Sequence, residues 1–553
     1  MNNPSAKRSS LPSAEWIRSL CLLMLFCCFL CLSSRSFADL TLTLDTKDGD
    51  TISDTARIVA HVVSDALVLK VEFKVDEMDR FTGSSTPYIY IWDTIADTGG
   101  AHKLTVTATD AIGKTKTTTI AVTVDNEIGT GAPALTEKAR AAVTANDYDA
   151  AFRYARRALK ADPNAVEAVR ALARGYVAQK KFDEAIEALE GLKNLAASAT
   201  ALNDAADYRL QRALLPKNFD AIVTEFPTIA DLRHKAAEIE VKQAAAQSGT
   251  AAGDALLKAG RFEDAQKQYG NTGEFTNVSL EVLADILGGH QREGAARLRA
   301  RIQDHKSTIA DRAVFGLAML LNHDAQTARN MVAQDLRTRV PASLIVAAYA
   351  DAALGKKEDS KMEATAAAKL APTAPETLYA LSMTAEPEAA QRYLATAIGE
   401  APYLTGPYLD LALLKAFGKG SDRNTQAFKL ISQAQKLDPD NINAKLIEIL
   451  LYLQAKQTAI PALTLKDLAR QYPNTPDILM TLSIYYQTLN QEANASKYLD
   501  AVNRIDSEHV GRSVTEQPLE FLKRVNREVH YRTGFFLTPQ TLVVPKTDTA
   551  SNP

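Results

Sequence analysis

The sequence feature that most constrains the fold is a self-similarity with a period of about 34 residues. Tyr148 in "NDYDAAFRYARRALKADPNA" aligns with Phe182 in "KKFDEAIEALEGL", and Ala151 aligns with Ala185, each one period further along. The surrounding sequence, from residue 135 to 530, is rich in Ala and has helical periodicity. A period of this length is typical of a two-helix unit that stacks on its neighbours to bury its apolar face. The segment therefore predicts an all-α superhelical solenoid.

Prolines mark the ends of further units in this segment. Pro372, Pro402, Pro439 and Pro473 close "AKLAP", "AIGEAP", "AQKLDP" and "ARQYP", and successive prolines are separated by roughly one such period. Because Pro cannot continue a helix, each one ends the second helix of a unit, while small Ala side chains let the two helices approach. Together with "GDALLKAGRFEDAQKQY", these units resemble tetratricopeptide repeats.

The resemblance to tetratricopeptide repeats is uneven along the chain. It is strong over residues 133–195, 250–270 and 340–507 and faint over 196–249 and 271–339. The faint stretches are still helical by period. We expect degenerate repeats there, with a separate helical domain inserted at 200–250 as the alternative.

Residues 39–128 have a different pattern, in which apolar and polar residues alternate. "TLTLD", "VLKVEFKVD", "YIYIWDT", "HKLTVTATD" and "TTTIAVTVDN" each fit a strand, and turn residues separate them. In "VEFKV" the alternation sends Val71, Phe73 and Val75 to one face and Glu72 and Lys74 to the other. Five to seven such strands predict a two-sheet β-sandwich.

The order of these strands resembles the immunoglobulin-like domains of bacterial surface and secreted proteins, with Trp92 as the core aromatic. The resemblance implies a spacer or adhesive module outside the cytoplasm. Asp45, Asp48 and Asp50 in "DTKDGD" could offer oxygen ligands to Ca²⁺, but the later Glu of an EF-hand is missing, and a solvated turn is the favoured interpretation. The fold class is thus multidomain: an all-β immunoglobulin-like sandwich, a linker at 129–134, and an all-α solenoid over 135–530.

The N-terminal residues 1–38 read as a secretory signal peptide. Basic residues precede an apolar core that contains "CLLMLFCCFLC", and Ala38 ends a small-x-small pattern suited to signal cleavage. The core is short for a transmembrane anchor, so cleavage is favoured over a retained anchor or a lipoprotein. We therefore expect an exported protein, periplasmic or at the cell surface or secreted, without a stable membrane span after cleavage. At the other end, "FLKRVNREVHYRTG" suggests a capping helix, and residues 531–553 an extended or disordered tail.

Few features of the sequence point to chemistry. All four cysteines lie in the signal segment, the eight histidines are never spaced i,i+3 or i,i+4, and the common nucleotide, hydrolase and zinc motifs are missing. We predict no metal, no cofactor and no enzymatic activity. Without residues 1–38 the chain has 59 basic and 65 acidic residues, a net charge of −6, so we expect no nucleic-acid partner.

The tetratricopeptide resemblance also implies which positions line the concave face, namely the fifth and ninth of each unit. For the early units these are Arg140, Arg170 and Arg174, a basic groove suited to an acidic peptide or anionic polymer, with a solvated basic face as the alternative. For the later units all of them are apolar and predict a groove for an amphipathic or extended peptide, unless curvature or residues 510–530 already bury them. These positions are Tyr379, Met383, Leu409, Leu413, Leu446, Leu450, Met480 and Ile484.

These features favour a non-enzymatic exported scaffold that binds protein partners of the cell envelope through its concave face, with a role in assembly or secretion of surface structures suggested by fold-level analogy. The alternative is a surface adhesin, or a cell-wall or carbohydrate-binding protein, that uses the sandwich. An exposed aromatic platform built from Tyr88 and Tyr90 would favour that alternative.

Overall fold

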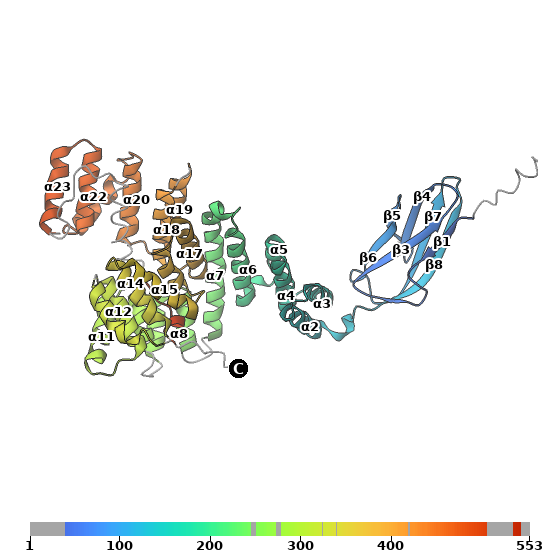
Figure 1. Ribbon diagram of the computed structural model, residues 1–553, viewed down its shortest axis with the longest axis horizontal. Coiled ribbons are helices and arrows are strands. Elements are labelled where there is room, and N and C mark those ends of the chain that lie inside the picture. The colour runs from blue at the N-terminus through green and yellow to red at the C-terminus, as the bar shows by residue number, and fades with distance from the viewer. Residues whose placement is uncertain are drawn as a thin grey trace, which may run out of the picture. The chain divides into compact units, whose positions relative to one another are not determined.

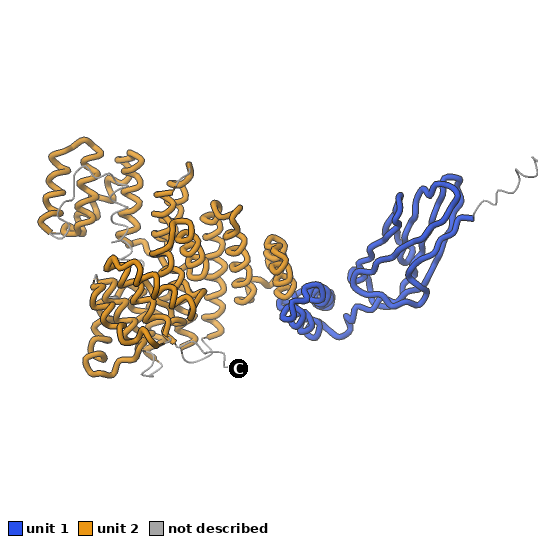
Figure 2. The backbone as a smooth tube through the Cα atoms, viewed as in Figure 1, with its two compact units in different colours: residues 1–168 blue, residues 169–553 orange. Residues whose placement is uncertain are grey.

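A computed structural model describes residues 39–244, 250–271, 278–322, 324–338, 340–418, 421–505 and 535–543. The chain divides into two compact units, residues 1–168 and 169–553, which we describe separately (Figure 2). The expected signal peptide with Ala38, the expected capping helix at 521–534 and the last ten residues lie outside the described residues. Within the described part, no helix is both long and apolar enough to cross a bilayer.

The first unit contains a β-sandwich of eight strands among its described residues (Figure 1). One sheet has the order β1-β3-β6 and the other the order β2-β8-β7-β4-β5. All strand pairs are antiparallel except β2 with β8, which is parallel. The strands are β1 (Thr41–Leu44), β2 (Thr51–Ile52), β3 (Thr55–Val63), β4 (Val68–Val75), β5 (Met78–Gly83), β6 (Tyr88–Asp93), β7 (Gly100–Asp110) and β8 (Thr115–Val124).

The core between the two sheets follows the alternation of the sequence. Val71, Phe73 and Val75 are fully buried, whereas Glu72 and Lys74 on the opposite face are partly exposed, which confirms the predicted faces of this strand. Trp92 is buried, as expected of the core aromatic. Strands β2, β3 and β5 were not among the five predicted segments. Strand β2 has only two residues, three consecutive residues of β3 are buried, and only one residue of β5 is.

Tyr88 and Tyr90 do not form the exposed platform that would have favoured the adhesin alternative. These side chains are only 5% and 9% exposed, and they belong to the core of the sandwich. Tyr90 stacks on Trp92 with 6.5 Å between ring centroids, because residues 88, 90 and 92 of one strand share a face. The feature that would have favoured a carbohydrate-binding surface is therefore not present at these residues.

Helices make up the remainder of the described chain and pair as successive hairpins. Side chains begin several of them: Asp147 accepts a hydrogen bond from the backbone of Ala150 at 3.0 Å, and Thr308 and Asp311 form a capping box. The helices of the first hairpins, up to the middle of the chain, are α2 (Ala132–Thr144), α3 (Tyr148–Ala161), α4 (Val166–Ala178), α5 (Phe182–Glu190), α6 (Ala199–Ala213), α7 (Ile222–Ala244), α8 (Thr250–Lys258), α9 (Phe262–Gly270), α10 (Val278–Leu287), α11 (Gln291–Gln303), α12 (Ile309–Leu321) and α13 (Ala325–Val332).

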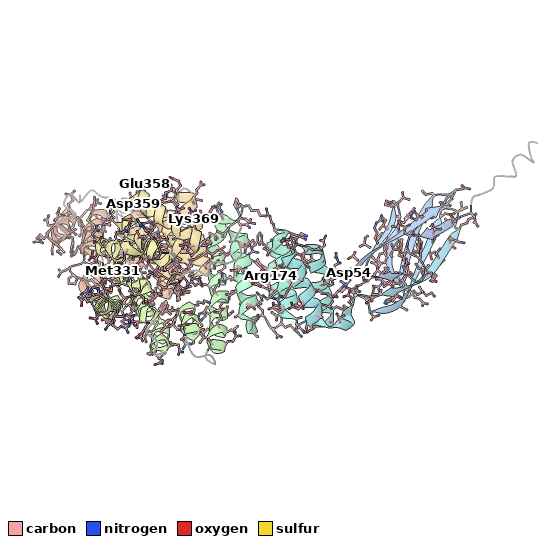
Figure 3. All side chains as sticks on the ribbon, turned by 60° about the horizontal axis from the view of Figure 1, so that its bottom comes forward. Asp54, Arg174, Met331, Glu358, Asp359 and Lys369 are labelled. Atoms are coloured by element: carbon pink, nitrogen blue, oxygen red, sulfur yellow. The ribbon has the colours of Figure 1, made fainter. Side chains whose placement is uncertain are left out.

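The later hairpins end where the prolines predict. Four of their second helices stop two residues before Pro372, Pro402, Pro439 and Pro473. In one of them, α15, acidic side chains occupy the first turn and Lys369 the last, which suits the helix dipole (Figure 3). These helices are α14 (Pro341–Ala353), α15 (Lys357–Leu370), α16 (Pro375–Ser382), α17 (Pro387–Glu400), α18 (Thr405–Phe417), α19 (Arg423–Leu437), α20 (Ile442–Gln454), α21 (Ala462–Gln471), α22 (Pro476–Thr488) and α23 (Glu492–Ile505).

The second unit also closes on itself, since helices far apart in the sequence are in contact. Helix α17 packs against α6 and α7, and α19 packs against α7. The approach is closest at Gly399, where an added Cβ would lie only 2.4 Å from Leu210 Cδ2. The rings of Phe226 and Tyr408 meet edge to face with centroids 6.0 Å apart. These contacts enclose an inner space between the early and the late repeats of this unit.

Candidate functional site

The inner space of the second unit holds a segment of the same chain. Residues 535–543 run without regular structure to Thr538, where a 3₁₀ turn follows (Pro539–Thr541), and we call this stretch the docked segment (Figure 1, red). Phe535, Phe536 and Leu537 are at most 3% exposed. Burial of such a side chain contributes roughly 1.5–3 kcal/mol. The sequence predicted an extended stretch here but did not indicate that it lies inside the solenoid.

Two tyrosines of neighbouring inner helices receive the aromatic pair of the docked segment. Phe535 packs on Tyr349 of α14 with ring centroids 4.8 Å apart, and Phe536 packs on Tyr379 of α16 at 5.4 Å. The Tyr349 hydroxyl donates to the backbone oxygen of Glu376 at 3.0 Å and lies 3.4 Å from that of Phe536. The inner face therefore provides an aromatic partner for each Phe ring.

Glu376 of α16 binds the polar end of the docked segment. Its Oε1 accepts hydrogen bonds from the Thr538 amide (2.9 Å), the Thr538 hydroxyl (2.7 Å) and the Thr541 hydroxyl (2.5 Å). The carboxyl is fully buried, and its Oε2 has no hydrogen-bond partner in another described residue. Burial raises the pKa of Glu376, and the hydrogen bonds from Thr541 and Thr538 offset only part of that effect.

A cavity of about 730 Å³ lies beside the docked segment, which forms one of its walls. The other walls come from helices α6, α7, α8, α10 and α16, the residue preceding α12 and its first turn, and the turn after α17. Residues of opposite charge share its surface. They are Arg233, Glu240, Asp254, Lys258 and Glu400.

The charged groups of the cavity are already engaged with one another. Arg233 forms an ion pair with Asp207 and lies 3.3 Å from Glu400, and Lys258 lies 3.1 Å from Glu240. Burial raises the pKa of Glu400, with Arg233 opposing the shift. The cavity therefore carries charges of both signs beside apolar side chains such as Leu257 and Leu280, a surface suited to a polypeptide with both polar and apolar groups.

Asp254 is the remaining carboxyl of the cavity, and it accepts a hydrogen bond from the Tyr269 hydroxyl at 2.6 Å. Burial raises the pKa of Asp254, opposed by the hydrogen bond from Tyr269 and by Lys258. Gly253, next to Asp254, permits this arrangement, because a Cβ there would lie 2.3 Å from the Tyr269 ring. The position of this carboxyl thus depends on the close packing of α8 on α9.

The structure buries most of the predicted apolar inner positions. Met383 is partly exposed, and the docked segment covers Tyr379. Seven of the eight side chains are at most 6% exposed, so they do not form an open groove. These seven are Tyr379, Leu409, Leu413, Leu446, Leu450, Met480 and Ile484. Residues 510–530, which offered one explanation for such burial, lie outside the described part of the chain.

The three predicted groove arginines fall in both units. Arg140 in the first unit is exposed and pairs with Glu137 at 2.7 Å. Arg170 in the second unit forms an ion pair with Asp204 at 2.6 Å, and both side chains are largely buried. Arg174, labelled in Figure 3, interacts with Tyr208, whose pKa burial raises to about 12. Each arginine thus has a partner within its own unit.

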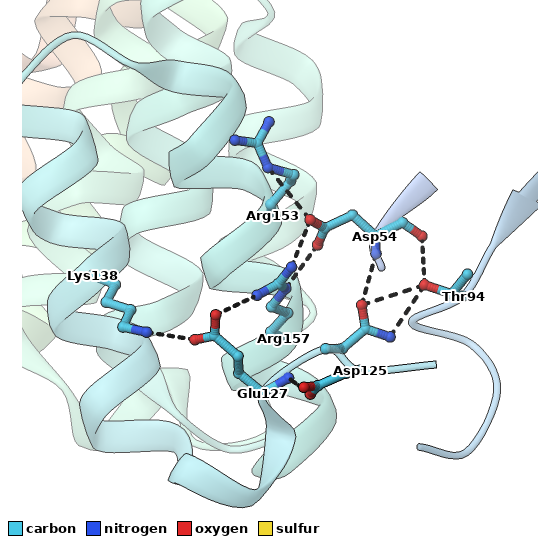
Figure 4. A network of polar contacts seen from close by, with 8 residues as sticks. Asp54, Thr94, Asp125, Glu127, Lys138, Arg153 and Arg157 are labelled. Atoms are coloured by element: carbon cyan, nitrogen blue, oxygen red, sulfur yellow. Dashed lines mark hydrogen bonds and ion pairs between the residues drawn. The ribbon is translucent and has the colours of Figure 1, made fainter. Parts of the chain in front are cut away.

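Basic residues of helix α3 contact the sandwich within the first unit (Figure 4). Asp54 has a positive φ of 54°, and its carboxylate accepts hydrogen bonds from Arg157 Nε (2.7 Å) and Nη2 (2.6 Å). Arg153 approaches the same carboxylate at 3.5 Å. The backbone of Asp54 is held by Asn126 Oδ1, which accepts from the Asp54 amide at 2.7 Å, and by Thr94, whose amide donates to the Asp54 oxygen at 2.8 Å.

Further pairs extend this contact, which we call the sandwich–helix joint. Arg156 pairs with Asp93, and the Lys160 ammonium donates to the Ala96 oxygen at 2.9 Å. Glu127 lies 3.6 Å from Arg157 and also pairs with Lys138. The joint is thus made of Asp54, Asp93, Ala96 and Glu127 on one side and Lys138, Arg153, Arg156, Arg157 and Lys160 on the other.

The aspartates considered for Ca²⁺ have separate partners. Asp48 accepts from the Ala121 amide at 2.7 Å, Asp50 from the Lys47 amide at 2.7 Å, and Asp45 contacts His61 at 2.6 Å. Among the described residues no three metal-ligating side chains converge. The geometry around these three carboxylates is that of a turn held by its own hydrogen bonds.

Comparisons with known proteins match both parts of the chain. The model of the bacterial Ig domain matches residues 41–106, and that of the tetratricopeptide repeat matches residues 142–206. No relative among curated proteins matches the sequence. The chain thus combines an immunoglobulin-like sandwich of bacterial type with a tetratricopeptide-like solenoid, which confirms the predicted fold class and both resemblances.

Solved structures with similar parts include the Cut9–Hcn1 heterotetramer of the APC/C, with 13% identity, a TM-score of 0.41, and coverage of 71% of this chain and 96% of that one. The human IFIT1 dimer with PPP-AAAA has 13% identity and a TM-score of 0.31, covering 61% of this chain and 90% of that one. Fibronectin(III)-like modules of Clostridium thermocellum CbhA have 22% identity and a TM-score of 0.14, covering 15% of this chain and 97% of theirs.

Proposed function

We propose that this chain is a non-enzymatic, exported scaffold whose helical repeats bind an extended segment of a protein partner in the inner space of the second unit. Tetratricopeptide repeats typically serve as interaction scaffolds without catalytic groups. The observation that carries the proposal is the docked segment itself. Tyr349, Glu376 and Tyr379 already bind this stretch of polypeptide through ring contacts and hydrogen bonds.

The place of action proposed is the periplasm or the cell surface. A bacterial immunoglobulin-like domain is often found outside the cytoplasm, and this supports export together with the signal-like residues 1–38. Fractionation of cells and sequencing of the mature N-terminus test this part. Export predicts a protein that begins at Asp39 in the envelope or medium fraction, and a full-length cytoplasmic protein would contradict it.

Partner binding can be tested by photo-crosslinking in cells from two lysines. Lys258 lines the cavity beside the docked segment, and Lys361 lies exposed on α15 as the matched control. A photoreactive residue at 258 should capture a protein through one short contiguous peptide, identified by mass spectrometry, while the same residue at 361 should not. Equal capture from both positions, or none from 258, would argue against the scaffold proposal.

A further inference from the structure

The docked segment has the properties of a bound ligand. Its first four residues have no regular structure, and its anchors are side chains that enter sites on α14 and α16. Leu542 near its end is 7% exposed, whereas the next residue, Val543, is 61% exposed. Within residues 535–543 the buried side chains therefore include an aromatic pair and two hydroxyl residues, as a recognition sequence would.

The fit between the docked segment and Glu376 is incomplete. Three donors converge on Oε1, but Oε2 is buried without a hydrogen-bond partner in another described residue. Among the described residues no cation pairs with this carboxylate either. A buried polar atom without a partner costs free energy, which opposes docking and is recovered when the segment leaves and water reaches the carboxylate. The apolar contacts favour docking, so the two effects oppose each other.

We propose that the α14–α16 site recognises extended partner peptides with two adjacent aromatic residues followed by hydroxyl residues at the spacing of Thr538 and Thr541, and that the docked segment is its intramolecular competitor. This inference rests on the proposed function and specifies its partner. A ligand that belongs to the same chain as its site benefits from a high effective concentration. A partner segment therefore binds in place of residues 535–543, and the docked segment sets the threshold for that exchange.

The test uses the purified full chain and a fluorescent synthetic peptide of sequence FFLTPQTLV, which reproduces residues 535–543. In the receiving protein, Phe535→Ala and Phe536→Ala together remove both aromatic anchors in cis. Neither residue belongs to a helix, and circular dichroism of the variant checks that the repeats keep their fold. The matched control is Val543→Ala, a change in the exposed last residue of the same segment.

We expect the double variant to bind the peptide at least ten times more tightly than the wild type and the Val543→Ala control do. A peptide with both Phe replaced by Ala should not bind, and Glu376→Ala added to the double variant should weaken binding several-fold. Thr538→Ala with Thr541→Ala provides a milder way to release the segment, with the same expected direction.

Equal affinity of the wild type and both released variants would overturn the proposal, because the segment would then not compete for the site. Absence of binding to either released variant, with unchanged circular dichroism, would also overturn it, because residues 535–543 would then be a permanent structural element. Neither outcome depends on a partner in cells, so this inference and the scaffold proposal can fail independently: capture from Lys258 tests the latter alone.

Discussion

The sandwich–helix joint of the first unit and the docked segment of the second hold chain segments in place by opposite chemistry. At the joint, Arg157 makes a bidentate pair with Asp54, and both side chains are largely buried. At the docked segment, aromatic burial dominates, and the buried carboxylate of Glu376 accepts from an amide and two hydroxyls of that segment, with no cation beside it among the described residues. A charge-paired contact suits permanent attachment, whereas a contact with an uncompensated carboxylate suits exchange.

The difference also explains what became of the two predicted grooves. The basic groove was expected to bind an acidic peptide or anionic polymer, with a solvated basic face as the alternative, whereas the basic residues of α3 pair with acidic residues of the chain's own sandwich. The apolar positions were expected to await an apolar segment, and at Tyr379 that segment is again part of the chain. In both regions the residue types indicated the chemistry of the occupant but not its origin.

The largest effect is expected from breaking the joint with Arg157→Ala. Loss of one member of a largely buried bidentate pair leaves Asp54 without its main cation and should cost about 3 kcal/mol in local opening. Native-state hydrogen exchange of the full chain measures it at the amides of Asp54 and Thr94. Arg153→Ala is the control, because its side chain is 47% exposed at 3.5 Å from Asp54, and it should cost less than about 1 kcal/mol. Similar costs for both variants would contradict the assignment of Arg157 as the main anchor.

The second largest effect is expected from a substitution where α17 packs on α6 in the second unit. This contact depends on steric fit and involves no charged pair. Gly399→Ala places a Cβ against Leu210 and should destabilise this unit by about 1–3 kcal/mol in denaturant unfolding. Leu210→Ala makes room for that Cβ, so the double variant should be more stable than the sum of the single effects predicts, by at least about 1 kcal/mol. Strict additivity would show that the two helices do not meet at these residues.

The local pattern of the sequence predicted some of these features and not others, for physical reasons. The alternation of apolar and polar residues correctly predicted that Val71, Phe73 and Val75 are buried. The same alternation indicates that Tyr88 and Tyr90 are buried too, because they share a strand face with the core residue Trp92. Prolines predicted helix ends because their effect is confined to neighbouring residues. The sequence thus determined features that depend on nearest neighbours.

Contacts between residues far apart in the sequence are not marked by any local sequence pattern of this kind. The approach of Leu210 to Gly399 joins α6 to α17, with ten other α-helices between them among the described residues. Glu376 and Thr538, which also meet, are likewise far apart in the sequence. One signal was available for the docked segment, namely the apolar clusters "FFL" and "LVVP", which lie close together near the C-terminal end of the sequence. Such a cluster indicates burial somewhere, but periodicity cannot identify the surface that buries it.

A smaller effect is expected from pH on the opening of the docked segment. This pH dependence should differ between the wild type and Glu376→Gln. Burial raises the pKa of Glu376 in the docked state, so docking is strongest below the ordinary Glu value and weakens as pH rises through the raised value. The nearby Tyr349 and Tyr403 also have pKa values raised by burial, so they stay neutral over this range.

Glu376→Gln keeps an acceptor oxygen and removes the charge. At pH 8 it should slow opening of the docked segment by roughly a factor of five, about 1 kcal/mol, as measured by hydrogen exchange at the Thr538 amide. At pH 5 the advantage should shrink, whereas a pH-independent difference would point to packing as its cause.

The smallest effect should come from salt. Measuring the opening of the joint and of the docked segment at two salt concentrations compares the two regions in one experiment. Between about 0.1 and 1 M NaCl the screening length falls from about 10 Å to about 3 Å, which weakens half-exposed pairs such as Arg156 with Asp93 by less than about 1 kcal/mol. The docked segment has no such pair among its described contacts, so its opening should not increase. Arg156→Gln should remove part of the salt response of the joint and none elsewhere. If salt opened both regions in parallel, the docked segment would depend on charge after all, and its proposed exchange by an aromatic partner peptide would need an ionic anchor in addition.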